Sequence, residues 1–145
     1  MVVAIAPAAE AESNAFSVMR GYGYFDSFCD LIERAGMVDT FEADGPITVF
    51  APDDAAFERM SAHARRSLED PAKLRALILY HVVDGRLTAF ELKREKPYGT
   101  VAGKRVEFLD MGGSLMINDA FIDTADIRAS NGLIHAIDKV LTPPS

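Results

Sequence analysis

Asn131-Gly132-Leu133-Ile134-His135-Ala136-Ile137-Asp138-Lys139-Val140-Leu141, near the C-terminal end of this 145-residue chain, is the stretch that decides the expected fold. An Asn-Gly turn is followed by aliphatic residues without strict alternation, a pattern typical of a strand buried on both faces. We therefore expect a central strand of a sheet here, and not a C-terminal tail.

Two earlier apolar segments precede this strand, and the first of them is its expected partner. Residues 47–51 run into Pro52 and are followed by a helix that Asp53 or Asp54 can cap. Asp70-Pro71 has the form of an N-cap followed by proline at the first helical position. Apolar residues then recur at helical spacing up to His81, so this histidine is expected to point into the core.

The other segments place helices first and strands later. A helix with an apolar stripe is expected over residues 24–35 and a helical turn over residues 37–41. Thr88 and Glu91 fit a capping box at the start of a further short helix. Turn residues then separate three short strands. These cover residues 105–110, 114–117 and 120–127, with Val106, Phe108, Leu115, Ile117, Phe121 and Ile122 as their expected buried side chains. The pattern predicts an α+β domain.

Three stretches in register, residues 48–57, 77–87 and 131–144, resemble the two signature boxes and the intervening Tyr-His motif of the fasciclin (FAS1) domain. The resemblance implies a β-wedge, or sandwich, with helices packed along one side. We expect one such domain over residues 14–145, after a disordered lead of residues 1–13. The motif residues to which a structural role is assigned are Thr48, Phe50, Pro52, Asn131, Gly132, His135 and Asp138.

Composition excludes some functions and leaves others open. The net charge of −7 argues against nucleic acid as a partner, and no window approaches the ~18 apolar residues of a membrane-spanning segment. We expect a monomer that does not insert into a membrane. Basic residues are few up to Glu58 and concentrated between Arg86 and Arg105. This uneven distribution either gives the molecule a polarised field that orients a partner or reflects an ordinary solvated surface.

The sequence offers no catalytic or metal-binding constellation, and we expect no cofactor. Cys29 is the single cysteine and shares a helical stripe with phenylalanines, which favours a packed core thiol. His63, His81 and His135 lack metal-ligand spacing. His81 and His135 lie in apolar segments, so a structural hydrogen-bonding role is the favoured interpretation, with a metal site and a pH-responsive core as the alternatives.

The resemblance also implies a function. In animal proteins of this family the Tyr-His motif and an Asp-Ile pair are associated with integrin recognition. Their counterparts are Tyr80-His81 and Asp126-Ile127. Asp126-Ile127 precedes a turn and is expected to be more accessible, with packing of Ile127 on the core as the equal alternative. Tyr80 and His81 end an apolar helix, so burial is the competing interpretation for them.

We therefore expect a non-catalytic adhesion or surface recognition module that binds a cell-surface protein. The alternative is a small-ligand carrier or sensor with a pocket between the helices and the β-wedge, and a more distant one is an enzyme whose site forms only in three dimensions. Residues 1–13 lack the features of a secretory signal. Family members are typically secreted, periplasmic or surface-attached, which we expect here, although the sequence leaves the cytoplasm open.

Overall fold

Strand β8 (Gly132–Ile137) lies inside a six-stranded sheet of order β2-β1-β8-β7-β6-β5 in the computed structural model, which describes residues 13–143. It pairs in parallel with β1 (Ile47–Pro52) and antiparallel with β7 (Ala120–Ala129). All six of its residues are buried. The predicted central strand is therefore confirmed.

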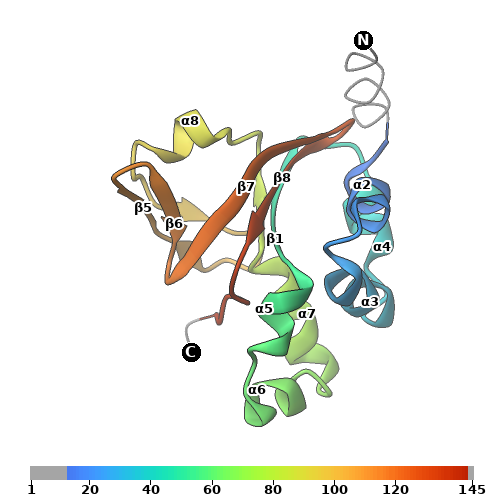
Figure 1. Cartoon of the computed structure of the whole chain (residues 1–145). Helices are drawn as coiled ribbons and strands as arrows, with labels where there is room; N and C mark the ends of the chain where they lie inside the picture. Colours follow the sequence, from blue (N-terminus) through green and yellow to red (C-terminus); the bar gives the residue numbers. More distant parts are fainter. Residues whose placement is uncertain (1–12, 144–145) are drawn as a thin grey trace.

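The other elements surround this sheet. The remaining strands are β2 (Val82–Asp84), β5 (Phe108–Met111) and β6 (Ser114–Ile117), with a separate pair β3 (Tyr98–Gly99) and β4 (Arg105–Val106). The helices are α2 (Ala15–Tyr22), α3 (Asp26–Arg34), α4 (Val38–Glu42), α5 (Asp54–Glu58), α6 (Ala62–Ser67), α7 (Pro71–Leu79) and α8 (Ala89–Leu92). In Figure 1 α2, α3 and α4 stand on one side of the central strands and β5 and β6 on the other. The expected α+β wedge with helices along one side is confirmed.

Burial of β8 on both faces follows from two apolar clusters. Successive side chains of a strand point to opposite faces. Ile134 and its partner Val49 on β1 belong to the cluster beneath α2, α3 and α7. Ile137 and Phe50 belong to the second cluster, which β5, β6 and α8 cover. The two-sided apolar composition of β8 is thus explained by its position between two cores.

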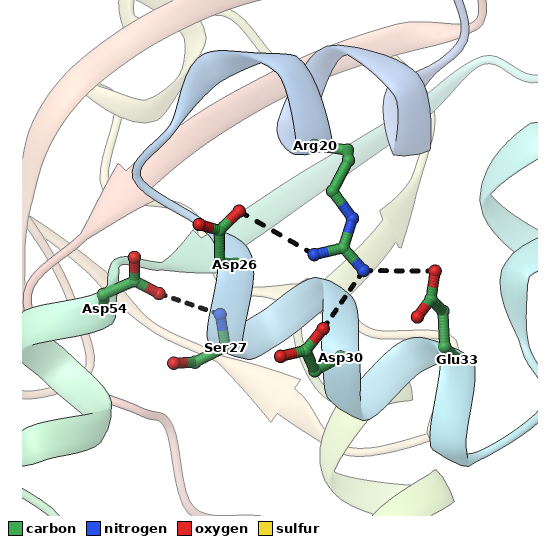
Figure 2. A network of polar contacts seen from close by, with 6 residues as sticks. All are labelled: Arg20, Asp26, Ser27, Asp30, Glu33 and Asp54. Carbon is green, nitrogen blue, oxygen red and sulfur yellow. Dashed lines mark hydrogen bonds and ion pairs between the residues drawn. The ribbon is translucent and has the colours of Figure 1, made fainter.

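Side-chain caps begin the helices at the positions that the sequence indicated. The carboxylate of Asp53 accepts a hydrogen bond from the Ala56 N–H, and Asp70 caps α7 in the same way. The Thr88 hydroxyl accepts from the Glu91 N–H at the start of α8. Asp54 has another role: its carboxylate accepts from the Ser27 N–H at 2.8 Å and so joins α5 to α3 (Figure 2).

Helix α2 was not predicted. The helix continues through Tyr22 and ends at Gly23, whose φ of 89° lies in the left-handed region that glycine tolerates. The predicted lead, residues 1–13, lies outside the described residues except for Ser13. The Ser13 carbonyl accepts a hydrogen bond from the Ser130 N–H, so Ser13 is in contact with the domain.

Arg20 joins α2 to α3 through carboxylates of α3 (Figure 2). Its guanidinium lies 3.7 Å from Asp26, 3.2 Å from Asp30 and 3.1 Å from Glu33. All three carboxylates are more than half exposed, and such pairs contribute at most about 1 kcal/mol each. They orient α2, while burial of Ala15, Val18 and Met19 accounts for most of its attachment.

Residues 62–67 form helix α6, which was not predicted because it buries no residue and therefore has no apolar stripe. One further expectation was wrong. Phe121 was expected in the core, yet it lies on the outer face and is 41% exposed. Ala120 points inward in its place, because it pairs with Ile117 on β6.

Asn131 is the junction at which α2, α4 and β1 meet β8. Its side-chain oxygen accepts a hydrogen bond from the Ala15 N–H at 2.8 Å. Its amide nitrogen donates to the carbonyls of Phe41, at 2.9 Å, and Ala43, at 2.7 Å. Its own carbonyl accepts from the Ile47 N–H. One buried side chain therefore satisfies three backbone groups that belong to distant parts of the chain.

Replacing Asn131 by alanine should lower the free energy of unfolding by about 3 kcal/mol, because buried backbone groups then lose their partners. Urea denaturation measures the change. Asn14→Ala is the matched control, since it removes an asparagine whose side chain caps α2 through an exposed hydrogen bond, and it should cost about 1 kcal/mol. Equal losses for the two variants would contradict the assigned role of Asn131.

Candidate functional site

The Tyr80 side chain is buried, so it does not form part of the surface. Its hydroxyl donates to the carbonyl oxygen of Arg105 at 2.8 Å and accepts from the amide nitrogen of Asn118 at 3.0 Å. These contacts join the end of α7 to β4 and to the turn between β6 and β7. A partner cannot touch this tyrosine in the described conformation.

His81 is also completely buried and joins α7 to the segment after β8. Its Nδ1 lies 2.7 Å from the carbonyl oxygen of Leu77, and its Nε2 accepts from the Leu141 N–H at 2.9 Å. Because the backbone N–H can only donate, Nε2 is the unprotonated nitrogen and Nδ1 carries the hydrogen. The neutral imidazole therefore satisfies both of its partners.

His135 forms a second buried junction, with the opposite tautomer. Its Nδ1 accepts from the Asp126 N–H at 3.1 Å, and its Nε2 donates to the carbonyl oxygen of Leu87 at 2.7 Å. Its ring stacks on Phe50, with centroids 5.4 Å apart. This histidine thus fixes the middle of β7 and the approach to α8 against the central strand.

Burial lowers the pKa of both histidines, since an apolar interior disfavours the charged imidazolium. For His81 the pKa falls from 6.5 to about 4. For His135 burial lowers the pKa, opposed by its hydrogen bond to Leu87 and by the Asp126 carboxylate. Both rings are neutral at pH 7, as their hydrogen bonds require.

Asp126-Ile127 does not lie at a turn, as the sequence suggested, but inside β7 at an irregularity of its pairing with β8. Asp126 is exposed and has a φ of 59°. Its carboxylate accepts from the Ala89 N–H at 2.9 Å, at the start of α8. Ile127 is only 7% exposed and packs in the first core. Of the four residues predicted to contact a partner, only Asp126 is accessible.

The other motif residues lie around the same strands. The Thr48 hydroxyl donates to the carbonyl of Gly85 at 2.7 Å and accepts from the Leu87 N–H at 2.8 Å. The Asp138 carboxylate accepts from the Phe121 N–H at 2.8 Å. Pro52 ends β1. These residues position backbone segments, and none of them forms a cleft with another reactive group.

Outside these contacts, burial and the nearby carboxylates of Asp138 and Asp53 raise the pKa of Asp123. Burial raises the pKa of the Cys29 thiol to about 12, so it stays protonated. Within residues 13–143 no three His, Cys, Asp or Glu side chains are arranged to hold a metal ion. No helix of this region is long and apolar enough to cross a membrane.

An exposed apolar row on the sheet is the surface feature that the sequence reasoning missed. Leu109 pairs with Met116, and Met116 pairs with Phe121, so the three side chains share one face of β5, β6 and β7. Met111 lies on the same face, two residues beyond Leu109. Leu109 is 47% exposed, Met111 57% and Phe121 41%. We call these four residues the β5–β7 row.

The alternation of β5 and β6 already contained a signal for this row. Phe108 and Ile117 point inward, so their neighbours Leu109 and Met116 must point outward although they are apolar. A strand with one solvated face normally carries polar residues at its outward positions. Apolar residues at these positions therefore indicate a surface that can bind a partner.

Lowering the pH should destabilise the domain through His81. Because its folded pKa, about 4, lies below the unfolded value, the unfolded state takes up a proton first as the pH falls. The contribution of His81 to stability is complete above pH 6.5 and is lost between pH 6.5 and 4. From pH 7 to pH 5 we expect a loss of about 2 kcal/mol from this residue, measured by urea denaturation.

His81→Gln should make the decline between pH 7 and pH 5 smaller, whereas His63→Gln should leave it unchanged because His63 is exposed. An NMR titration of the imidazole signals tests the same point in the wild-type protein. If the His81 ring titrates near pH 6.5, the buried neutral junction is wrong.

The comparisons with known proteins agree with this architecture. A family model described as the fasciclin domain matches residues 23–143. Protein sll1483 of Synechocystis is 34% identical over 140 residues, which cover 94% of this chain and 77% of that protein. The cell surface glycolipoprotein MPB83 of Mycobacterium bovis is 33% identical over 110 residues, 75% of this chain and 49% of that protein.

A solved structure extends the agreement to the fold. It is the FAS1 domain pair of the insect cell adhesion molecule Fasciclin I, with a TM-score of 0.71 and 23% sequence identity, covering 86% of this chain and 47% of that chain. The family model, the relatives and the fold thus agree over the same region. The chain belongs to the fasciclin domain family, whose members are non-enzymatic adhesion and surface proteins.

Proposed function

We propose that this domain is a surface recognition module that binds a protein partner through the β5–β7 row. The observation that carries the proposal is the contiguity of Leu109, Met116 and Phe121 across three strands. Burying such side chains against a partner is favourable by about 25 cal/mol per Å² of apolar surface. A cell surface glycolipoprotein and an insect cell adhesion molecule among the similar proteins support a role at a cell surface.

The acidic residues beside the row indicate the chemistry of the partner. Asp119 and Asp123 are exposed at the β7 end of the row, close to Phe121 in sequence. The chain has a net charge of −7. A partner that presents an apolar contact surrounded by lysine or arginine would match this face in both respects.

Docking on the face of the sheet is favoured over addition of a strand to its edge. Strand β5 is the edge strand, and the carboxylate of Glu95 already accepts from its Asp110 N–H at 2.8 Å. The Asp110 carboxylate accepts from the Gly113 N–H, which closes the turn beside it. An edge occupied in this way offers few free backbone groups to another strand.

The size of the row predicts weak binding by a single copy. Three strands spaced about 4.8 Å apart present a narrow contact. Standard stable interfaces bury about 800 Å² on each partner. Presentation in many copies on a surface would convert such weak contacts into firm attachment.

Replacing Phe121 by glutamate should abolish most attachment of protein-coated beads to cells to which wild-type beads attach. A charge in the centre of an apolar contact commonly weakens binding by about 30-fold or more. Tyr24→Glu is the matched control, because Tyr24 is 56% exposed and lies between α2 and α3, away from the row. Circular dichroism and thermal unfolding establish that both variants are folded.

Attachment that survives Phe121→Glu, or that Tyr24→Glu reduces equally, would contradict the assignment of the binding face. Asp126→Asn is a third arm, since Asp126 is the accessible member of the predicted Asp-Ile pair. A loss of attachment in that variant alone would move the binding site from the row to the start of α8.

A further inference from the structure

A hollow of about 540 Å³ lies among α5, α6, α7 and the segment that follows β8, and its lining includes no residue of the β5–β7 row. In Figure 1 these helices group below the sheet, and the chain after β8 runs back toward α5. Its wall is largely apolar, with Met60, Leu68, Leu77 and Val140 as the larger side chains. The volume is in the range of small-molecule sites.

This position differs from the one that the sequence suggested for a ligand pocket. The interface between the helices and the β-wedge is filled by the first core, which includes Phe28, Phe41 and Ile134. The hollow lies beyond the end of β8, where short helices pack around a segment without regular structure.

The charged side chains that line the hollow are all positive. Arg59, Lys73 and Lys139 line it, and none of the described residues that line it is acidic. This is unusual for a chain with a net charge of −7. The site therefore combines an apolar wall with a cationic rim, which is complementary to an anionic amphiphile.

The three cations are not equally available. The Arg59 guanidinium donates to the carbonyl oxygen of Asp138 at 2.7 Å, and Lys139 lies 3.6 Å from the carboxylate of Asp119. Lys73 is exposed and forms no ion pair within residues 13–143. Lys73 is accordingly the cation best placed to gain a new anionic partner.

Neutral hydrogen-bonding groups at the hollow are largely occupied. The Ser61 hydroxyl accepts from the Ala64 N–H as the cap of α6, and the Ser67 hydroxyl donates to the Ala64 carbonyl. A ligand that depends on many directional hydrogen bonds, such as a sugar, would find few partners here. The ligand specificity of the hollow therefore depends on charge and on apolar contact.

We propose that this hollow binds a single-chain amphiphile with a carboxylate head, of the fatty-acid type. The chain lies against Met60, Leu68 and Leu77, and the carboxylate lies at the rim beside Lys73. This adds a ligand site to the protein-binding role proposed above, and it does not depend on that role.

Dodecanoate, kept below its micelle concentration, is the probe for this site, and isothermal titration calorimetry measures its binding to the wild-type chain. We expect saturable binding of one molecule, at least about tenfold tighter than that of dodecyltrimethylammonium, which has the same chain and a positive head. Lys73→Glu should weaken dodecanoate binding about fivefold or more.

Two further variants separate the site from general electrostatic and apolar binding. Arg75→Glu makes the same change in net charge on an exposed residue of α7 that does not line the hollow, and it should leave the affinity unchanged. Ala76→Phe places a ring in the hollow from an exposed helical position and should abolish binding without unfolding the domain.

Three results would each overturn the proposal: no saturable binding of dodecanoate, equal affinity for the two head groups, or equal effects of Lys73→Glu and Arg75→Glu. If only Ala76→Phe failed to fold, the comparison of the two charge variants would still decide the matter. A bead-attachment defect in Phe121→Glu does not decide the dodecanoate result, because Phe121 is not among the residues that line the hollow.

Discussion

The parallel pairing of β1 with β8 is the interaction on which the rest of the structure depends, and it is possible only because the two strands start very close together. An added Cβ at Gly132 would overlap the backbone carbonyl of Ile47, and one at Gly45 would overlap the carbonyl of Asn131. Only glycine allows two backbones to approach in this way. Asn131 then uses its side chain to hold the start of α2 and the end of α4 at the same point.

From this junction the two buried histidines extend the connection along the molecule. His81 joins α7 to the segment after β8, and His135 joins β7 and the approach to α8 to the central strand. Each ring is neutral and each nitrogen has one partner, so the polar atoms cost little to bury. Substitutions in the Tyr80-His81 motif therefore act first on stability, and loss of binding in such a variant is informative only when folding has been measured.

The surfaces available for function lie at the periphery of this framework. The β5–β7 row is on the outer face of the strands farthest from α2, α3 and α4, and the hollow is among the short helices beyond the C-terminal end of β8 (Figure 1). The row contains none of the residues of the buried junctions, whereas Leu77, whose carbonyl oxygen is a partner of His81, also lines the hollow. Binding on these faces can therefore vary through surface substitutions without disturbing the pairing of β1 and β8.

The sequence alone was enough to predict the α+β class and the central position of residues 132–137. It also predicted the helix caps Asp53, Asp70 and Thr88 and the inward direction of His81. These features depend on the local pattern of apolar residues and on side-chain chemistry near the backbone. Only the tertiary structure decided which residues are accessible. Ile127 is buried beside the irregular pairing of β7 with β8. Phe121 is exposed, contrary to expectation, because Ala120 pairs with Ile117 on β6 and takes the inward position. The hollow likewise combines residues 56–77 with residues 139–143. Segments so far apart in the chain are brought together by sheet pairing, which no local pattern records.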